Sequence, residues 1–169
     1  MKNLGKQFEE NWKKSVPDYM FYYRFRDSSG TWGGNEQLRF TPSNIADCLI
    51  QDPFTGLHLI ELKNHKGKSI PLSCIIGTRK NDKPTTKEKQ INDLLIADGY
   101  SSVFSSLIVF FCDVERCFEL SINSFLDFVN KGERMSIPIE YFEKHGTEIK
   151  VTKIRTSYRF DIESWMREF

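Results

Sequence analysis

Residues 45–63 read Ile-Ala-Asp-Cys-Leu-Ile-Gln-Asp-Pro-Phe-Thr-Gly-Leu-His-Leu-Ile-Glu-Leu-Lys. Two runs rich in β-forming residues, 45–50 and 57–63, lie on either side of a segment that contains Pro53 and Gly56. Turn-forming residues between two such runs are typical of a β-hairpin. We therefore expect two antiparallel strands that bring the ends of this stretch together.

The second strand carries charges on one face. Because side chains alternate along a strand, Glu61 and Lys63 share one face while Ile60 and Leu62 lie on the other. The hairpin can place Asp47 beside the charged pair. Apolar residues around the charges indicate that this strand is largely buried.

The rest of the chain predicts helices and further strands around this hairpin. Residues 103–112 are almost continuously apolar, as in a central buried strand, and 117–120 read as its neighbour. Thr85 and Glu88 form a capping box that opens a helix ending at Gly99. Other expected elements are a helix opened by Asn3 and ended before Pro17, a strand at 20–25, a loop or loose hairpin tip at 27–37, a helix at 123–131, a strand with Ile149, Val151 and Ile154, and a last turn capped by Asp161.

This order predicts an α/β fold in which helices flank a mixed central sheet, without an internal repeat. At 169 residues, the chain fits a single domain, 1–169. The four cysteines lie in apolar or strand-like runs without a C-x-x-C pair, which favours buried thiols in a reducing compartment. A charged N-terminus and the absence of a long apolar run predict a cytoplasmic protein without a membrane role.

The net charge is only +1, from 24 Lys and Arg against 23 Asp and Glu, so any site for a polyanion must be local. Two carboxylates, Asp47 and Glu61, beside the Lys63 ammonium form the oxygen-rich kind of site that Mg²⁺ prefers. Such a site predicts hydrolysis of a phosphodiester, with Lys63 orienting water or offsetting charge in the transition state. On its own, a Glu-x-Lys pattern also fits a solvated strand face.

The chain resembles the RecU-type Holliday junction resolvases of the PD-(D/E)xK nuclease superfamily. The matching stretches are Gly5-Lys6-Gln7-Phe8-Glu9, Asp47, Glu61-Leu62-Lys63, Ser69-Ile70-Pro71-Leu72 and Lys89-Gln90-Ile91, followed by the apolar strand to Cys112. The resemblance implies a restriction-endonuclease-like core in which Asp47 and Glu61 bind Mg²⁺, or Mn²⁺ in its place, and Lys63 assists the nucleophile. It also implies accessory active-site roles for Glu9 and Gln90.

Members of that family are homodimers that cut four-way DNA junctions, and a stalk projects into the junction centre. The stalk counterpart here is 24–42, which is rich in glycine and looks short. Ile45-Ala46 stand where hydroxyl-bearing residues commonly precede the first catalytic Asp, and 75–83 is extra length before the helix. These departures concern junction selectivity and leave the metal-site residues in place.

Basic residues near these segments predict DNA contacts. Arg24, Arg26 and Arg39 alternate with aromatic residues, a pattern in which Arg binds phosphates and aromatic rings stack on bases. Lys66 and Lys68 follow the candidate site and could hold the DNA backbone. Ordinary solvated charges explain either group about equally well.

We therefore expect a metal-dependent, structure-selective DNA endonuclease, a homodimer that resolves four-way junctions by paired phosphodiester hydrolysis. One alternative is a PD-(D/E)xK nuclease that acts on duplex or flap DNA. The other is a catalytically silent DNA-binding accessory protein of recombination. The three histidines lack metal-ligand spacing, and no Ser-His-Asp or Cys-His arrangement is visible.

Overall fold

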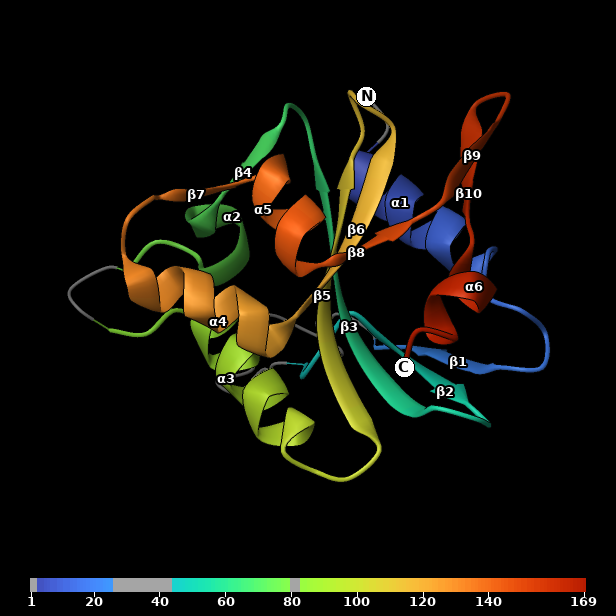
Figure 1. The fold of residues 1–169 in the computed structure, drawn as a ribbon, viewed down its shortest axis with the longest axis horizontal. Coiled ribbons are helices and arrows are strands. Elements are labelled where there is room, and N and C mark those ends of the chain that lie inside the picture. Colours follow the sequence, from blue (N-terminus) through green and yellow to red (C-terminus); the bar gives the residue numbers. More distant parts are fainter. Residues whose placement is uncertain (1–2, 26–43, 80–82) are drawn as a thin grey trace, which may run out of the picture.

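The computed structural model describes residues 3–25, 44–79 and 83–169. Within them, six strands form a mixed sheet in the order β1-β2-β3-β5-β6-β8 (Figure 1). The expected mixed sheet flanked by helices is therefore confirmed. The strands are β1 (Phe21–Arg24), β2 (Cys48–Asp52), β3 (Gly56–His65), β5 (Val103–Phe111), β6 (Arg116–Ser121) and β8 (Thr147–Ile149).

The predicted hairpin and the predicted central strand form the middle of this sheet. β2 and β3 pair antiparallel, with Cys48 opposite Ile60. β3 and β5 pair in parallel along nine residues of each strand, and β6 returns antiparallel to β5. Because each of β3 and β5 has a strand on both sides, their backbone groups are satisfied within the sheet.

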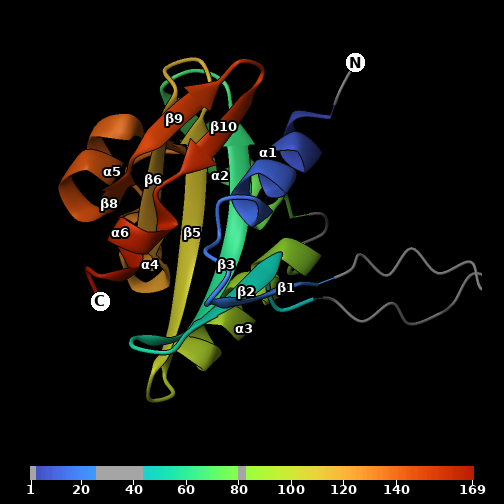
Figure 2. The ribbon, with the colours of Figure 1, turned by 90° about the vertical axis from the view of Figure 1, so that its right-hand side faces the viewer.

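Helices cover both faces of the sheet (Figure 1). One face packs against α2 (Leu72–Ile76), α3 (Thr86–Asp98), α4 (Ile122–Lys131) and α5 (Ile139–His145). The other packs against α1 (Leu4–Lys13), α6 (Ile162–Met166) and a hairpin of β9 (Val151–Ile154) and β10 (Ser157–Phe160). This hairpin lies beside α1, where the Gln7 side chain donates to the Thr156 carbonyl at 3.1 Å (Figure 2).

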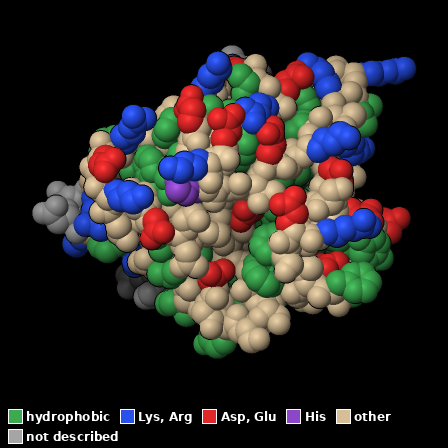
Figure 3. Space-filling model, in the orientation of Figure 1, with side chains coloured by type: hydrophobic (Ala, Val, Ile, Leu, Met, Phe, Trp, Pro, Cys, Tyr) green, Lys and Arg blue, Asp and Glu red, His purple; other side chains and the backbone are tan. Residues whose placement is uncertain are grey.

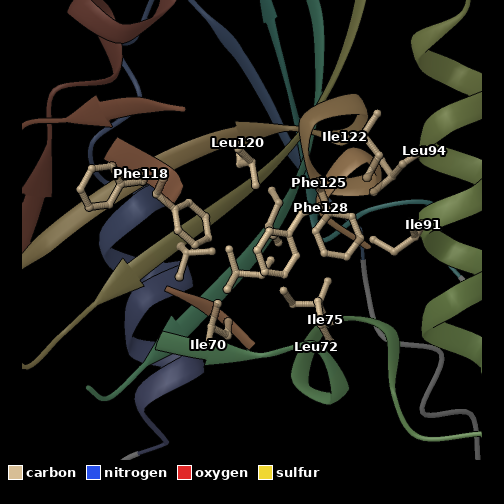
Figure 4. Packing of buried hydrophobic residues seen from close by; sticks show 14 of the residues in the cluster. Ile70, Leu72, Ile75, Ile91, Leu94, Phe118, Leu120, Ile122, Phe125 and Phe128 are labelled. Atoms are coloured by element: carbon tan, nitrogen blue, oxygen red, sulfur yellow. The ribbon is translucent and has the colours of Figure 1, made fainter. Parts of the chain in front are cut away.

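Two apolar cores follow from this layering. Ile91 and Leu94 of α3 meet Phe125 and Phe128 of α4 over the sheet (Figure 4). On the opposite face, Phe8 and Trp12 of α1 pack with Phe160 and Trp165. Full burial of each such side chain contributes roughly 1.5–3 kcal/mol to folding.

The expected helix boundaries are confirmed where a side chain caps the helix. The Asn3 carboxamide accepts from the Gly5 amide, Thr85 and Glu88 form the reciprocal capping box, and Asp161 caps α6. Gly132 ends α4 in the left-handed conformation, with φ of 66°. Each of these caps involves residues only a few positions apart, so it can be predicted from the sequence.

Residues 136–149 differ from the expectation. The segment before Ile149 forms β7 (Ser136–Pro138) and α5, neither of which was predicted, and the predicted late strand is two strands, β8 and β9. β7 pairs antiparallel with β4 (Ser69–Pro71), and both strands have the sequence Ser-Ile-Pro.

Two further expectations concern cysteines and membranes. Cys48 and Cys117 are buried, but Cys74, on α2, and Cys112, just after β5, are half-buried, so the prediction of four buried thiols is wrong for two. In the described ranges, no helix combines the length and apolar character that a membrane crossing requires. The predicted loop 27–37 lies outside the described residues, as does nearly all of the predicted stalk, 24–42.

A buried histidine holds the turn of the β2–β3 hairpin. His58 is 1% exposed and stacks on Phe104, with ring centroids 4.9 Å apart. Its Nε2 lies 2.9 Å from the Thr55 hydroxyl, which donates to the Asp52 carboxylate at 2.9 Å. Burial lowers the pKa of His58 from 6.5 to about 4.

We predict that His58 weakens the fold at mildly acidic pH. Because its folded pKa lies below its unfolded value, stability from neutral His58 is present above about pH 6.5 and is lost as pH falls towards 4. Between pH 7 and pH 5 this loss amounts to about 2 kcal/mol. Urea unfolding at both pH values should show a smaller loss in His58→Gln than in the wild type, and equal losses would contradict the assignment.

Candidate active site

The hairpin places Asp47 next to the charged face of β3, as predicted. Asp47 directly precedes β2, and its amide donates to the Ile60 carbonyl at 3.1 Å. Its carboxylate Oδ2 accepts from the Leu62 amide at 2.8 Å. This bond holds the Asp47 side chain against the backbone between Glu61 and Lys63.

Glu61 is the centre of the site. It is 4% exposed, and one carboxylate oxygen accepts from the Lys63 ammonium. The other oxygen accepts from the Gln90 carboxamide of α3 at 2.7 Å. The structure therefore brings together Asp47, Glu61, Lys63 and Gln90, four of the five residues expected to be catalytic.

Burial and charge act on these groups in opposite directions. Burial raises the pKa of Glu61 to about 7, with a further rise from Asp47 and a partial offset from Lys63. Burial lowers the pKa of Lys63, but the two carboxylates outweigh it and the net pKa is raised. Lys63 is thus held as an ammonium ion.

Glu9, the fifth residue, occupies a different position. α1 packs through Phe8 on the sheet face that carries Ile60 and Leu62, opposite to Glu61. The Glu9 carboxylate forms an ion pair with Arg24 of β1 and raises the pKa of Lys63 as a minor contribution. Arg24, expected to contact DNA, therefore contacts Glu9.

The other expected DNA contacts divide into two groups. Lys66 and Lys68 are exposed in the turn after β3, where the Gly67 amide donates to the Asp113 carboxylate at 2.9 Å. Arg26 and Arg39 lie outside the described residues. The basic turn thus lies where the sequence predicted it, just past β3.

Sequence reasoning missed Lys87. Its ammonium donates to the Cys74 carbonyl at 3.0 Å, and its charge lowers the pKa of Glu61. Lys87 precedes Gln90 by three residues, so both share one face of α3. That spacing becomes informative only once Gln90 is known to touch Glu61.

The carboxylates fit a hard divalent cation. Among the residues described, no group of three or more His, Cys, Asp and Glu side chains converges as a ready metal site. Mg²⁺ needs only one or two protein carboxylates and takes its other ligands from water and substrate phosphate. Because burial and Asp47 disfavour the charged form of Glu61, a cation held by both carboxylates would offset that cost.

Comparison with known proteins places the chain in a family. No model of a known protein family matches the sequence. The chain is 30% identical, over 173 residues, to the SPbeta prophage-derived uncharacterized protein YotM of Bacillus subtilis (strain 168). The chain belongs to the same family as YotM. The match covers 94% of this chain and 82% of YotM, an extent that includes the whole segment from Asp47 to Gln90.

We predict that Mg²⁺ or Mn²⁺ stabilises the protein through Glu61. At a metal concentration ten times the dissociation constant, binding adds about 1.4 kcal/mol, and thermal unfolding should move up by roughly 3–5 °C. Glu61→Gln should lose this shift in a thermal melt.

Glu119→Gln is the matched control. Glu119 is 5% exposed, burial raises its pKa to about 7, and it accepts from the Ser106 hydroxyl at 2.7 Å, away from the site. This variant should keep the metal-dependent shift. A shift that survives in Glu61→Gln would show that the metal binds elsewhere.

Proposed function

We propose that this protein is a Mg²⁺-dependent DNA endonuclease of the PD-(D/E)xK superfamily that resolves four-way junctions, as RecU-type enzymes do. One observation carries the proposal: the Asp47 carboxylate is bonded to the Leu62 amide beside a buried Glu61–Lys63 pair. Glu61 and Lys63 share one face of β3, and Asp47 directly precedes the adjacent strand β2. This is the arrangement that the resemblance leads us to expect.

Each residue has a distinct part in the proposed hydrolysis. Asp47 and Glu61 would hold the metal, which when bound supplies Lewis acidity toward the phosphate. Gln90 fixes the Glu61 carboxylate through its 2.7 Å hydrogen bond. Because its pKa is raised, Lys63 acts as a cation that orients the attacking water and offsets charge on the phosphorane, and not as a general base.

The surroundings of the site support the proposed restriction-endonuclease-like core. β3 carries Glu61 and Lys63 and lies between β2 and β5, while α3 delivers Gln90 from one face. The prophage origin of YotM fits a role in phage recombination. A four-way junction has two strands to cut, which suits a two-fold homodimer.

Cleavage of duplex or flap DNA is the second candidate. The glycine-rich stalk counterpart and the Ile45-Ala46 pair favour it, because both depart from the resolvase pattern. A silent accessory protein is disfavoured, since Asp47, Glu61 and Lys63 are all present and converge with Gln90 from separate elements.

We predict that Asp47→Asn abolishes cleavage, to below roughly one hundredth of the wild-type rate, and leaves DNA affinity within a few-fold. Asparagine keeps an acceptor for the Leu62 amide but loses the metal-binding charge. Labelled four-way junction, linear duplex and flap are each incubated with Mg²⁺ or with chelator, and products and binding are measured.

Asp127→Asn, an exposed change on α4, serves as the control and should cut normally. Paired symmetrical nicks in the junction support the resolvase, and cutting confined to duplex or flap supports the second candidate. Binding without cleavage by the wild type, or full cleavage by Asp47→Asn, would refute the proposed active site.

A further inference from the structure

A cavity of about 320 Å³ lies where α4 ends and α5 begins, apart from the candidate active site. Basic side chains line it from both helices and from the segment between them: Lys131, Arg134, Lys144 and His145. Lysine and arginine side chains gather over α4 and α5 on the face in Figure 3, with acidic side chains between them. The cavity therefore combines a concave shape with a local group of basic side chains.

Aromatic rings form the floor of this cavity. The Tyr141 ring meets Phe128 edge-on, at 4.7 Å between centroids, and its hydroxyl donates to the Ser124 carbonyl at 2.9 Å. The His145 ring lies over Tyr141 at 4.3 Å with an interplanar angle of 30°. Because the hydrogen bond and Phe128 fix Tyr141, the exposed His145 ring rests on a rigid support.

The cations of this cavity are available to a ligand. Within the described part of the chain, no ion pair includes Lys131, Arg134 or Lys144. Glu133 and Glu140 also line the cavity, so three Lys and Arg side chains face two carboxylates. An anion is favoured, and the carboxylates can accept hydrogen bonds from the N–H groups of a base.

Backbone hydrogen bonds join the cavity to the basic turn beyond β3. The Ile139 amide, at the start of α5, donates to the Lys68 carbonyl at 2.8 Å. The Leu72 amide donates to the Met135 carbonyl at 2.9 Å. Lys68 follows Lys63 by five residues, which span at most about 18 Å. The basic turn with Lys66 and Lys68 therefore links β3, which carries Lys63, to the start of α5, which lines the cavity.

We propose that this cavity binds one unpaired nucleotide of the DNA strand, with its phosphate among Arg134, Lys144 and Lys131 and its base stacked on His145. The proposal rests on the proposed function for the identity of its ligand. A volume near 320 Å³ is at the low end for ligand pockets, which suits a single nucleotide and not a duplex. Cations beside a stacking platform are how proteins bind single strands without sequence preference.

The test measures binding of a labelled oligothymidylate by fluorescence anisotropy, with chelator present so that no cleavage occurs. Arg134→Gln/Lys144→Gln should weaken binding about tenfold and lower the slope of log affinity against log salt by about 0.7, because one phosphate is no longer neutralised. His145→Ala should weaken binding roughly 5- to 100-fold without changing that slope.

Lys150→Gln/Arg155→Gln removes the same charge from two exposed residues, one just before β9 and one in the β9–β10 turn, and is the matched control. It should bind oligothymidylate as the wild type does. Equal weakening in this control would overturn the proposal, as would wild-type binding by His145→Ala. Tighter binding of the matching duplex, weakened in the same way by Arg134→Gln/Lys144→Gln, would assign the cavity to duplex DNA instead and also overturn it.

Cleavage assays separate this proposal from the nuclease assignment. A protein that cuts no DNA, yet binds oligothymidylate with the expected variant pattern, would refute the nuclease and keep the nucleotide site. Cleavage that depends on Asp47, together with normal oligothymidylate binding by the cavity variants, would keep the nuclease and refute the nucleotide site.

Discussion

The hydrogen bond from the Leu62 amide to the Asp47 carboxylate joins the candidate site to the central sheet. Cys48, the first residue of β2, pairs with Ile60, and Leu62 lies two residues further along β3, opposite chain that precedes β2. The Asp47 side chain therefore serves as acceptor for an amide beyond the paired part of β2. A buried backbone amide needs a hydrogen-bond acceptor. The Leu62 amide of β3 therefore fixes the position of the Asp47 carboxylate, and the carboxylate in turn satisfies that amide.

Glu61 and Glu119 are both buried, but they have different neighbours. That difference separates a candidate active site from a structural hydrogen bond. Glu61 and Glu119 are equally buried, and burial raises the pKa of each to about 7. Glu119 accepts from the Ser106 hydroxyl, a neutral donor on the adjacent strand. Glu61 lies beside a second carboxylate and an ammonium, and a separate helix holds it through Gln90. A perturbed pKa alone therefore does not identify the site, whereas the convergence of charges from several elements does.

Short-range patterns in the sequence predicted most of the sheet and its helices. The hairpin turn, the capping box at Thr85 and the apolar run of β5 each depend on neighbouring residues, and all three were confirmed. The positions of Asp47, Glu61 and Lys63 followed from strand alternation and hairpin pairing. Strand alternation and hairpin pairing say nothing about which helices pack against the sheet. The sequence pattern therefore could not predict the ion pair between Glu9 and Arg24 or the position of Lys87.

The β4–β7 ribbon explains why the cavity at α5 escaped sequence analysis. Each of its strands is a three-residue Ser-Ile-Pro segment, too short for a period of two to be recognised. Pairing of Ile70 with Ile137, 67 positions apart in the sequence, nevertheless brings α5 next to the chain that follows β3. Both isoleucines are almost fully buried, so the ribbon is held by the core and not by its few hydrogen bonds. A loss of packing at this pair would therefore displace α5 from the basic turn and leave Asp47, Glu61 and Lys63 in place, since none of the three belongs to the ribbon.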